Sequence, residues 1–162
     1  MAAPVWLPEM VSVDGIWEDI LSRLYDIFDR DFNEGQPKLK GLPVWWDRRI
    51  LKGEIYEEGF WHLISRNEER TDDRLFDPRK AERLPWCKPA LTHADDFSVK
   101  LWDSQEGRHS RTYIWLEDHD YVIVLEKRRQ RVSQVAFLIT AYHVDGAGRR
   151  ESLRKKYTKR IP

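Results

Sequence analysis

The sequence predicts an α+β fold, in which an N-terminal helical layer packs on a curled antiparallel sheet of about four to five strands and a basic helix ends the chain. Two observations predict it. Apolar residues recur at helical spacing over Ser12–Phe32, and the C-terminal half holds four β-rich runs separated by turns. At 162 residues the chain has the length of about one domain. We therefore expect a single domain over residues 1–162, with an acidic helical segment over 1–36 and an α+β core over 44–160.

The first helix is predicted over Ser12–Phe32, because Ile16, Ile20 and Leu24 stand four residues apart and form one apolar stripe. The other face is strongly acidic, with Glu18, Asp19, Asp26, Asp29 and Asp31. This acidic face is either the solvent side of a packed helix or a docking surface.

The middle of the chain is expected to hold one buried strand, Phe60–Arg66, because the run is short, apolar and aromatic. A charged loop is expected over residues 67–89. Within it, Pro78–Leu84 is predicted to form a helical segment, since Asp77 can cap its start and Pro78 stands at the first helical position.

The C-terminal half is predicted to form an antiparallel meander followed by a basic helix over Arg149–Arg160. Its β-rich runs are separated by charged or turn-forming stretches of the length that hairpins need. The four runs are Phe97–Trp102, Arg111–Glu117, Tyr121–Lys127 and Val135–Val144.

The overall charge is zero but is unevenly distributed. Residues 1–97 carry 14 Lys and Arg against 20 Asp and Glu, whereas residues 98–162 carry 14 against 8. The basic half suggests an anionic partner, although compensating surface patches explain it equally well. Cys87 is the single cysteine, which argues against a disulfide-framed secreted module. With no signal peptide or membrane-spanning run visible, we expect a cytoplasmic protein that does not contact membranes.

His62 is the first candidate for catalysis. An imidazole is unusual in a buried apolar run, and histidine exchanges protons near neutral pH, so it can act as a general base or acid without a metal. The alternative is a hydrogen-bonded core histidine. We expect no metal and no cofactor, because the His, Cys and Asp spacings match no known ligand pattern.

Alternation along the last predicted strand adds Thr140 and Tyr142. Both hydroxyls should project from the same face as Ala136 and Leu138, where they can contact a phosphate oxygen. His143 should lie on the opposite, buried face, which favours a structural role for it.

A helical turn with two arginines is the third candidate element. Arg79 and Arg83 stand four residues apart and share a face, and a guanidinium matches the geometry of a phosphate. Trp86 follows and could stack on a base. Pairing of Arg83 with a neighbouring carboxylate is an equally good explanation.

Three pieces of the chain resemble the barnase–EndoU–colicin–RelE class of ribonuclease toxins, especially its phage- and prophage-associated members. They are the Phe-Trp-His-Leu-Ile-Ser-Arg run, the Arg-Lys-Ala-Glu-Arg-Leu-Pro-Trp segment, and the meander Tyr-Ile-Trp-Leu-Glu … Tyr-Val-Ile-Val-Leu-Glu-Lys … Phe-Leu-Ile-Thr-Ala-Tyr. The resemblance covers residues 44–160 and rests on arrangement more than on a signature. It implies a metal-independent endoribonuclease acting as a toxin or defence effector.

The resemblance also implies roles. His62 would transfer a proton, Arg83 would stabilise the phosphate together with Arg66 or Arg111, and Thr140 and Tyr142 would position it. RNA-binding contacts would come from Arg66, Arg79, Trp86, Arg111, Lys155, Lys156 and Arg160. The substrate would be RNA, with tRNA and ribosome-bound mRNA among the candidates, and an acidic antitoxin or immunity protein would block the site. The alternatives are a non-catalytic interaction protein, such as an immunity or inhibitor protein, and an RNA-binding module without chemistry.

Overall fold

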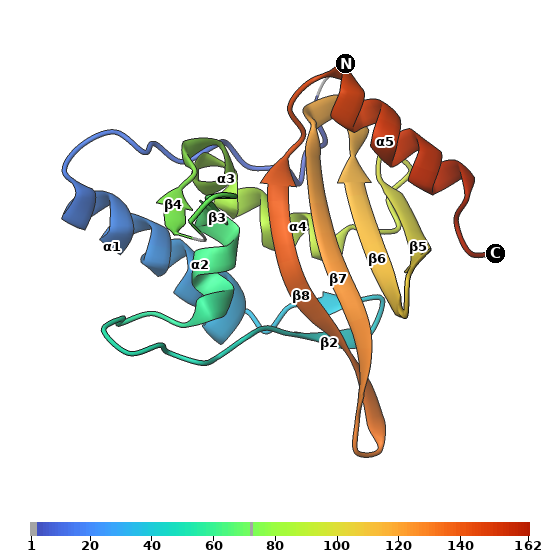
Figure 1. Ribbon diagram of the computed structural model, residues 1–162, viewed down its shortest axis with the longest axis horizontal. Coiled ribbons are helices and arrows are strands. Elements are labelled where there is room, and N and C mark those ends of the chain that lie inside the picture. Colours follow the sequence, from blue (N-terminus) through green and yellow to red (C-terminus); the bar gives the residue numbers. More distant parts are fainter. Residues whose placement is uncertain (1–2, 72) are drawn as a thin grey trace.

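The computed structural model describes residues 3–71 and 73–162 and shows an α+β fold built around one mixed sheet (Figure 1). The strand order is β1-β2-β8-β7-β6-β5, and a separate two-stranded sheet pairs β3 with β4. The strands are β1 (Lys38–Leu39), β2 (Leu42–Trp45), β3 (Ser65–Asn67), β4 (Arg74–Phe76), β5 (Lys100–Glu106), β6 (His109–Leu116), β7 (Tyr121–Gln130) and β8 (Ser133–His143).

The predicted antiparallel meander is confirmed, since β5, β6, β7 and β8 pair antiparallel in sequence order. The main sheet is larger than expected and is not purely antiparallel, because β2 pairs parallel with β8 through Val44 and Trp45. The sheet is not closed.

Helices cover both faces of the sheet. They are α1 (Trp17–Phe28), which continues as a π-helical segment (Asp29–Glu34), α2 (Glu58–Ile64), α3 (Pro78–Glu82), α4 (Leu84–Thr92) and α5 (Ala147–Thr158); a 3-10 turn (Glu117–His119) joins β6 to β7. The larger core lies between the N-terminal helices and one sheet face. A smaller core lies between the other face and α5, which crosses the upper ends of the strands in Figure 1.

The first helix begins later than predicted, at Trp17, but its apolar stripe is confirmed. Ile20, Leu24 and Phe28 are all buried, and the stripe ends on the buried Phe32. The acidic face is not uniformly exposed, because Asp31 is 6 % exposed and accepts hydrogen bonds from Arg30.

The prediction of a strand over Phe60–Arg66 is wrong. Residues up to Ile64 are helical as α2, and only β3, beginning at Ser65, is extended. A short apolar run fits either a buried strand or a buried helix, and here Phe60, Leu63 and Ile64 all turn into the larger core at helical spacing. Residues 67–89 likewise hold β4, α3 and α4 rather than one loop.

Gly59 lets α2 approach Trp46 closely. A β-carbon there would lie 2.6 Å from Trp46 Cδ1. Because Trp46 is buried in the larger core, its ring has little room to move away. We expect Gly59→Ala to reduce the free energy of unfolding by about 1–3 kcal/mol, because overpacking outweighs the helix-propensity gain. Gly148→Ala is the matched control: it also lies in a helix but has no atom within 4 Å, so it should stabilise by about 0.5 kcal/mol. Urea titration of both variants measures the difference, and a stabilised Gly59→Ala protein would contradict it.

A β-bulge changes which side chains of β8 share a face. The register with β7 shifts between Val124 and Leu125, so the simple alternation used to predict the faces fails beyond Leu138. Ala141 packs in the larger core, as Leu138 does, whereas Tyr142 packs against the smaller core. The expectation that Tyr142 shares the face of Leu138 is therefore wrong.

Candidate active site

A pocket of about 290 Å³ opens where the end of α2 meets β3, β4, α3 and β8. β2 pairs with β8 at Ala136 and Phe137, and α2 and α3 also pack beside β8. The pocket is lined by His62, Ser65, Arg66, Asn67, Arg74, Lys80, Ile139 and Thr140. Three of these side chains, Arg66, Arg74 and Lys80, are cationic at pH 7, so the pocket suits an anionic ligand.

Lys80 holds the pocket together. Its Nζ donates to the backbone oxygens of His62 (2.7 Å) and Ser65 (2.8 Å) and to Thr140 Oγ1 (3.0 Å). A helix leaves its last carbonyl groups without intrahelical partners, and here a buried ammonium supplies the donors at the end of α2. Burial lowers the pKa of Lys80 to about 8.

Thr140 completes the same network from β8. Its hydroxyl donates to the oxygen of His62 at 3.1 Å while its Oγ1 accepts from Lys80. The last turn of α2, the start of α3 and the central part of β8 are thereby joined at one point. These hydrogen bonds fix the backbone that carries the His62 imidazole.

An ion pair fixes the other side of α2. Arg74 donates to both carboxylate oxygens of Glu58, at 2.7 and 2.9 Å, in a two-pronged arrangement. The carboxylate is almost fully buried, and the pairing lowers the pKa of Glu58. Glu58 stands four residues before His62 on the helix, so its charge lies beside the imidazole.

His62 is half-buried and lines the wall of the pocket, so it is not a fully enclosed core histidine. Burial is the main cause that lowers its pKa below the usual 6.5; Arg74 and Lys80 lower it further, and Glu58 opposes them. The imidazole is therefore mainly in its neutral form at pH 7, in which it can accept a proton.

The structure brings together three of the predicted site residues, His62, Arg66 and Thr140, in this pocket. Arg66 is exposed at its rim. Sequence reasoning did not single out Lys80 and Arg74. The predicted cap of α3 is confirmed, since Asp77 accepts from the backbone N–H of Lys80, but a fully engaged buried lysine is rare and nothing in the sequence marks it.

The predicted arginines lie on the other side of α3. Arg79 Nη1 is 3.1 Å from His143 Nε2, and Arg83 donates to the Arg79 oxygen and to Glu82. Burial and the two guanidinium charges lower the pKa of His143. Trp86 is only 8 % exposed and donates to the oxygen of Pro8, so little of its ring is open to a base.

Tyr142 also lies outside the pocket, against the smaller core, where burial raises the pKa of its phenol. Nearby, Lys156 contacts Glu106 and the hydroxyl of Tyr113. The predicted RNA-binding Arg111 pairs with Glu126 at 3.3 Å. Arg160 lies over the ring of Tyr157, and Lys155 is exposed on α5.

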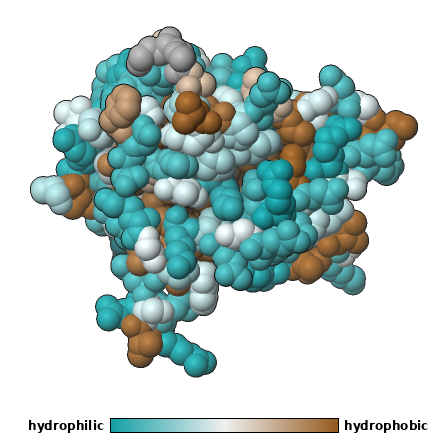
Figure 2. All heavy atoms as spheres, turned by 180° about the vertical axis from the view of Figure 1, so that it is seen from behind, coloured by the Kyte–Doolittle hydropathy of each residue, from teal (hydrophilic) through white to brown (hydrophobic). Residues whose placement is uncertain are grey.

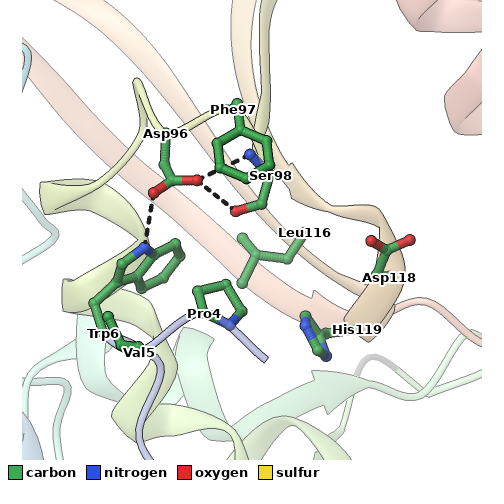
Figure 3. Close-up of a pocket in the computed structure, with 9 residues that line it drawn as sticks. All are labelled: Pro4, Val5, Trp6, Asp96, Phe97, Ser98, Leu116, Asp118 and His119. Carbon is green, nitrogen blue, oxygen red and sulfur yellow. Dashed lines mark hydrogen bonds between the residues drawn. The ribbon is translucent and has the colours of Figure 1, made fainter. Parts of the chain in front are cut away.

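A separate, mainly apolar hollow of about 260 Å³ lies at the N-terminal segment (Figure 3). Trp6 donates to Asp96, which also accepts from the backbone and hydroxyl of Ser98. Phe97 is fully exposed at its rim, although the sequence places it at the start of a strand. This hollow contains none of the predicted site residues.

Comparison with protein-family models, curated proteins and solved structures finds no significant match for the chain. Within residues 3–71 and 73–162, no helix is both long and apolar enough to cross a membrane. Over the same residues, no three His, Cys, Asp or Glu side chains cluster in a way that could hold a metal ion.

Proposed function

We propose that this chain is a metal-independent endoribonuclease that cleaves RNA by attack of a ribose 2′-hydroxyl on the adjacent phosphate. The observation that carries the proposal is the His62 pocket. A neutral imidazole there faces an open space lined by cationic side chains, which combines a proton acceptor with an anion-binding surface.

His62 is the general base in this proposal. It takes the proton of the 2′-hydroxyl, and the 2′-oxygen forms a bond to phosphorus as the bond from phosphorus to the 5′-oxygen breaks. Arg66, which is exposed at the pocket rim, binds the phosphate oxygens. The products are a 2′,3′-cyclic phosphate and a free 5′-hydroxyl.

The leaving 5′-oxygen takes its proton from water. Lys80 lines the same pocket as His62 and is charged at pH 7, since its pKa is about 8. Its N–H groups are used by the oxygens of His62 and Ser65 and by Thr140, so it contributes charge rather than a proton. Its charge also stabilises the negative charge that develops on the phosphate. Tyr142 packs against the smaller core, so it does not position the phosphate in this pocket.

The cellular role follows from the resemblance to ribonuclease toxins. An enzyme of this kind would act on cytoplasmic RNA as a toxin or defence effector, and an acidic antitoxin or immunity protein would hold it in check.

One specific observation favours a second candidate, an RNA-binding module without chemistry. Both the Lys80 ammonium and the Thr140 hydroxyl are engaged in hydrogen bonds that hold α2, α3 and β8 together. In that case the pocket would bind phosphate and leave the RNA intact.

The chemistry of the fragment ends tests the proposal. We expect the purified protein to cleave a defined RNA in excess chelator, leaving 2′,3′-cyclic phosphate and 5′-hydroxyl ends. A matched oligonucleotide with 2′-deoxyribose at the cleaved positions should stay intact, because it lacks the nucleophile. Cleavage of the deoxy substrate, or 5′-phosphate ends, would refute this mechanism. Tight RNA retention without cleavage would support the binding module.

A further inference from the structure

The far end of the β7–β8 hairpin projects beyond the rest of the molecule as a two-stranded arm (Figure 1). We call residues 127–134 the hairpin arm. Its last pairs are Arg129 with Gln134 and Gln130 with Ser133, and they lie past the point where β2 joins β8. The same projection is visible at the lower left of Figure 2, where hydrophilic surface surrounds a small hydrophobic group.

The arm is strongly basic. It contains Lys127, Arg128, Arg129 and Arg131, and the sequence has no Asp or Glu between Glu126 and Asp145. Lys127 pairs with Asp103 and Arg128 with Glu126, both at the base of the arm. Within the described chain, the guanidinium groups of Arg129 and Arg131 have neither an ion-pair nor a hydrogen-bond partner. Two free cations therefore stand at the outer end.

The tip lies outside the cores of the fold. Val132 is 95 % exposed, and Arg131 adopts a left-handed backbone conformation with φ of 50°, which is unfavourable for a residue with a side chain. Neither packs into a core cluster. A cluster of exposed positive charges favours contact with an anionic partner.

We propose that the hairpin arm binds the phosphate backbone of the RNA strand whose cleavage occurs in the His62 pocket. This inference rests on the proposed function. The arm and the pocket share β8: seven residues separate Ser133 from Thr140, which at about 3.3 Å per residue is about 23 Å. A strand of several nucleotides bridges that distance, so the arm selects for long RNA over short fragments.

Binding is tested first, without any need for cleavage. The probe is a fluorescent 2′-O-methyl RNA long enough to span arm and pocket, which has no free 2′-hydroxyl. For Arg129→Gln/Arg131→Gln we expect at least a tenfold weaker Kd, and a slope of log K against log salt smaller by about 1.4, because two phosphate contacts are lost. Arg108→Gln/Lys52→Gln is the control: it removes two exposed cations outside the arm and should change neither quantity.

Equal Kd and equal salt slope in the two double variants would refute RNA binding by the hairpin arm. Displacement of the RNA by polyglutamate at matched charge concentration would refute it too, by pointing to an acidic protein as the partner.

Cleavage kinetics then connect the arm to the pocket. The arm variant should raise KM for the long RNA and leave kcat/KM for a dinucleotide unchanged, since a dinucleotide cannot reach the arm. Equal losses on both substrates would refute the bridging geometry. If the protein cleaves nothing, the proposed function fails, while the 2′-O-methyl RNA still reports whether the arm binds.

Discussion

His62→Gln is expected to lower the rate of RNA cleavage by about 10²–10⁴-fold, the usual contribution of a general base. Glutamine keeps much of the size and polarity of the imidazole but cannot take up a proton. The backbone oxygen of His62, which accepts from Lys80 and Thr140, is retained in the variant. The fold should therefore persist, and circular dichroism with urea titration checks that it does.

The pH dependence of cleavage by the unmodified protein tests whether His62 acts as the base. A base works in its neutral form, so kcat/KM should rise with pH through the pKa of His62 and then level off. Because burial lowers this pKa below 6.5, the acidic limb should lie below pH 6.5. A rate that falls as the pH rises from 5 to 7 would instead make His62 the acid.

His143→Gln is the matched control for the histidine. Its imidazole also has a lowered pKa, but it contacts Arg79 on the other side of α3 and does not line the pocket. We expect cleavage to be unchanged. If His143→Gln loses as much activity as His62→Gln, then the site lies at the arginine cluster and the assignment of the pocket is wrong.

Lys80→Met should lower the free energy of unfolding by about 3 kcal/mol, since it removes three hydrogen bonds from a buried charged donor. Burying the ammonium costs free energy, so its removal offsets part of the loss. Guanidinium titration, followed by tryptophan fluorescence, measures the change. Arg79→Met, on the same helix but exposed, is the control and should cost less than about 1 kcal/mol. A change below 1 kcal/mol in Lys80→Met would contradict the role of Lys80 as the joint between α2, α3 and β8.

The unmodified protein and Lys80→Met should also differ in how the free energy of unfolding depends on pH. Burial places the pKa of Lys80 at about 8 in the folded protein, below the ordinary 10.5 of the unfolded chain. Between these values the unfolded chain binds more protons, so the parent gains stability as the pH rises. Lys80→Met lacks this gain, and the difference in unfolding free energy between the two proteins should grow from pH 8 to pH 10.

Much of the fold could be predicted from local patterns. The meander is visible because β5 to β8 are separated by short turns, and neighbouring antiparallel strands need only local pairing. The start of α3 is visible because Asp77 and Pro78 act on the backbone of the next few residues. Both signals are local in sequence.

The geometry of the site was harder to predict. Phe60 to Ile64 are apolar in either a strand or a helix, and only the core against Trp46 and Phe28 decides for the helix. The bulge opposite Val124 cannot be read from alternation, so the side of Tyr142 was predicted wrongly. Lys80 became part of the pocket because α3 packs beside β8, a contact between residues 60 positions apart.

By itself the sequence determined the α+β class, the order of the four C-terminal strands, and the presence of His62, Arg66 and Thr140 as candidate residues. Only the tertiary structure decided that these three share one pocket with Lys80 and Arg74, while Arg83, Tyr142 and Trp86 lie elsewhere. The physical reason is that helix capping and strand pairing act over a few residues. The position of a side chain in a pocket depends instead on how whole elements pack, and here one bulge and one buried ammonium set that packing.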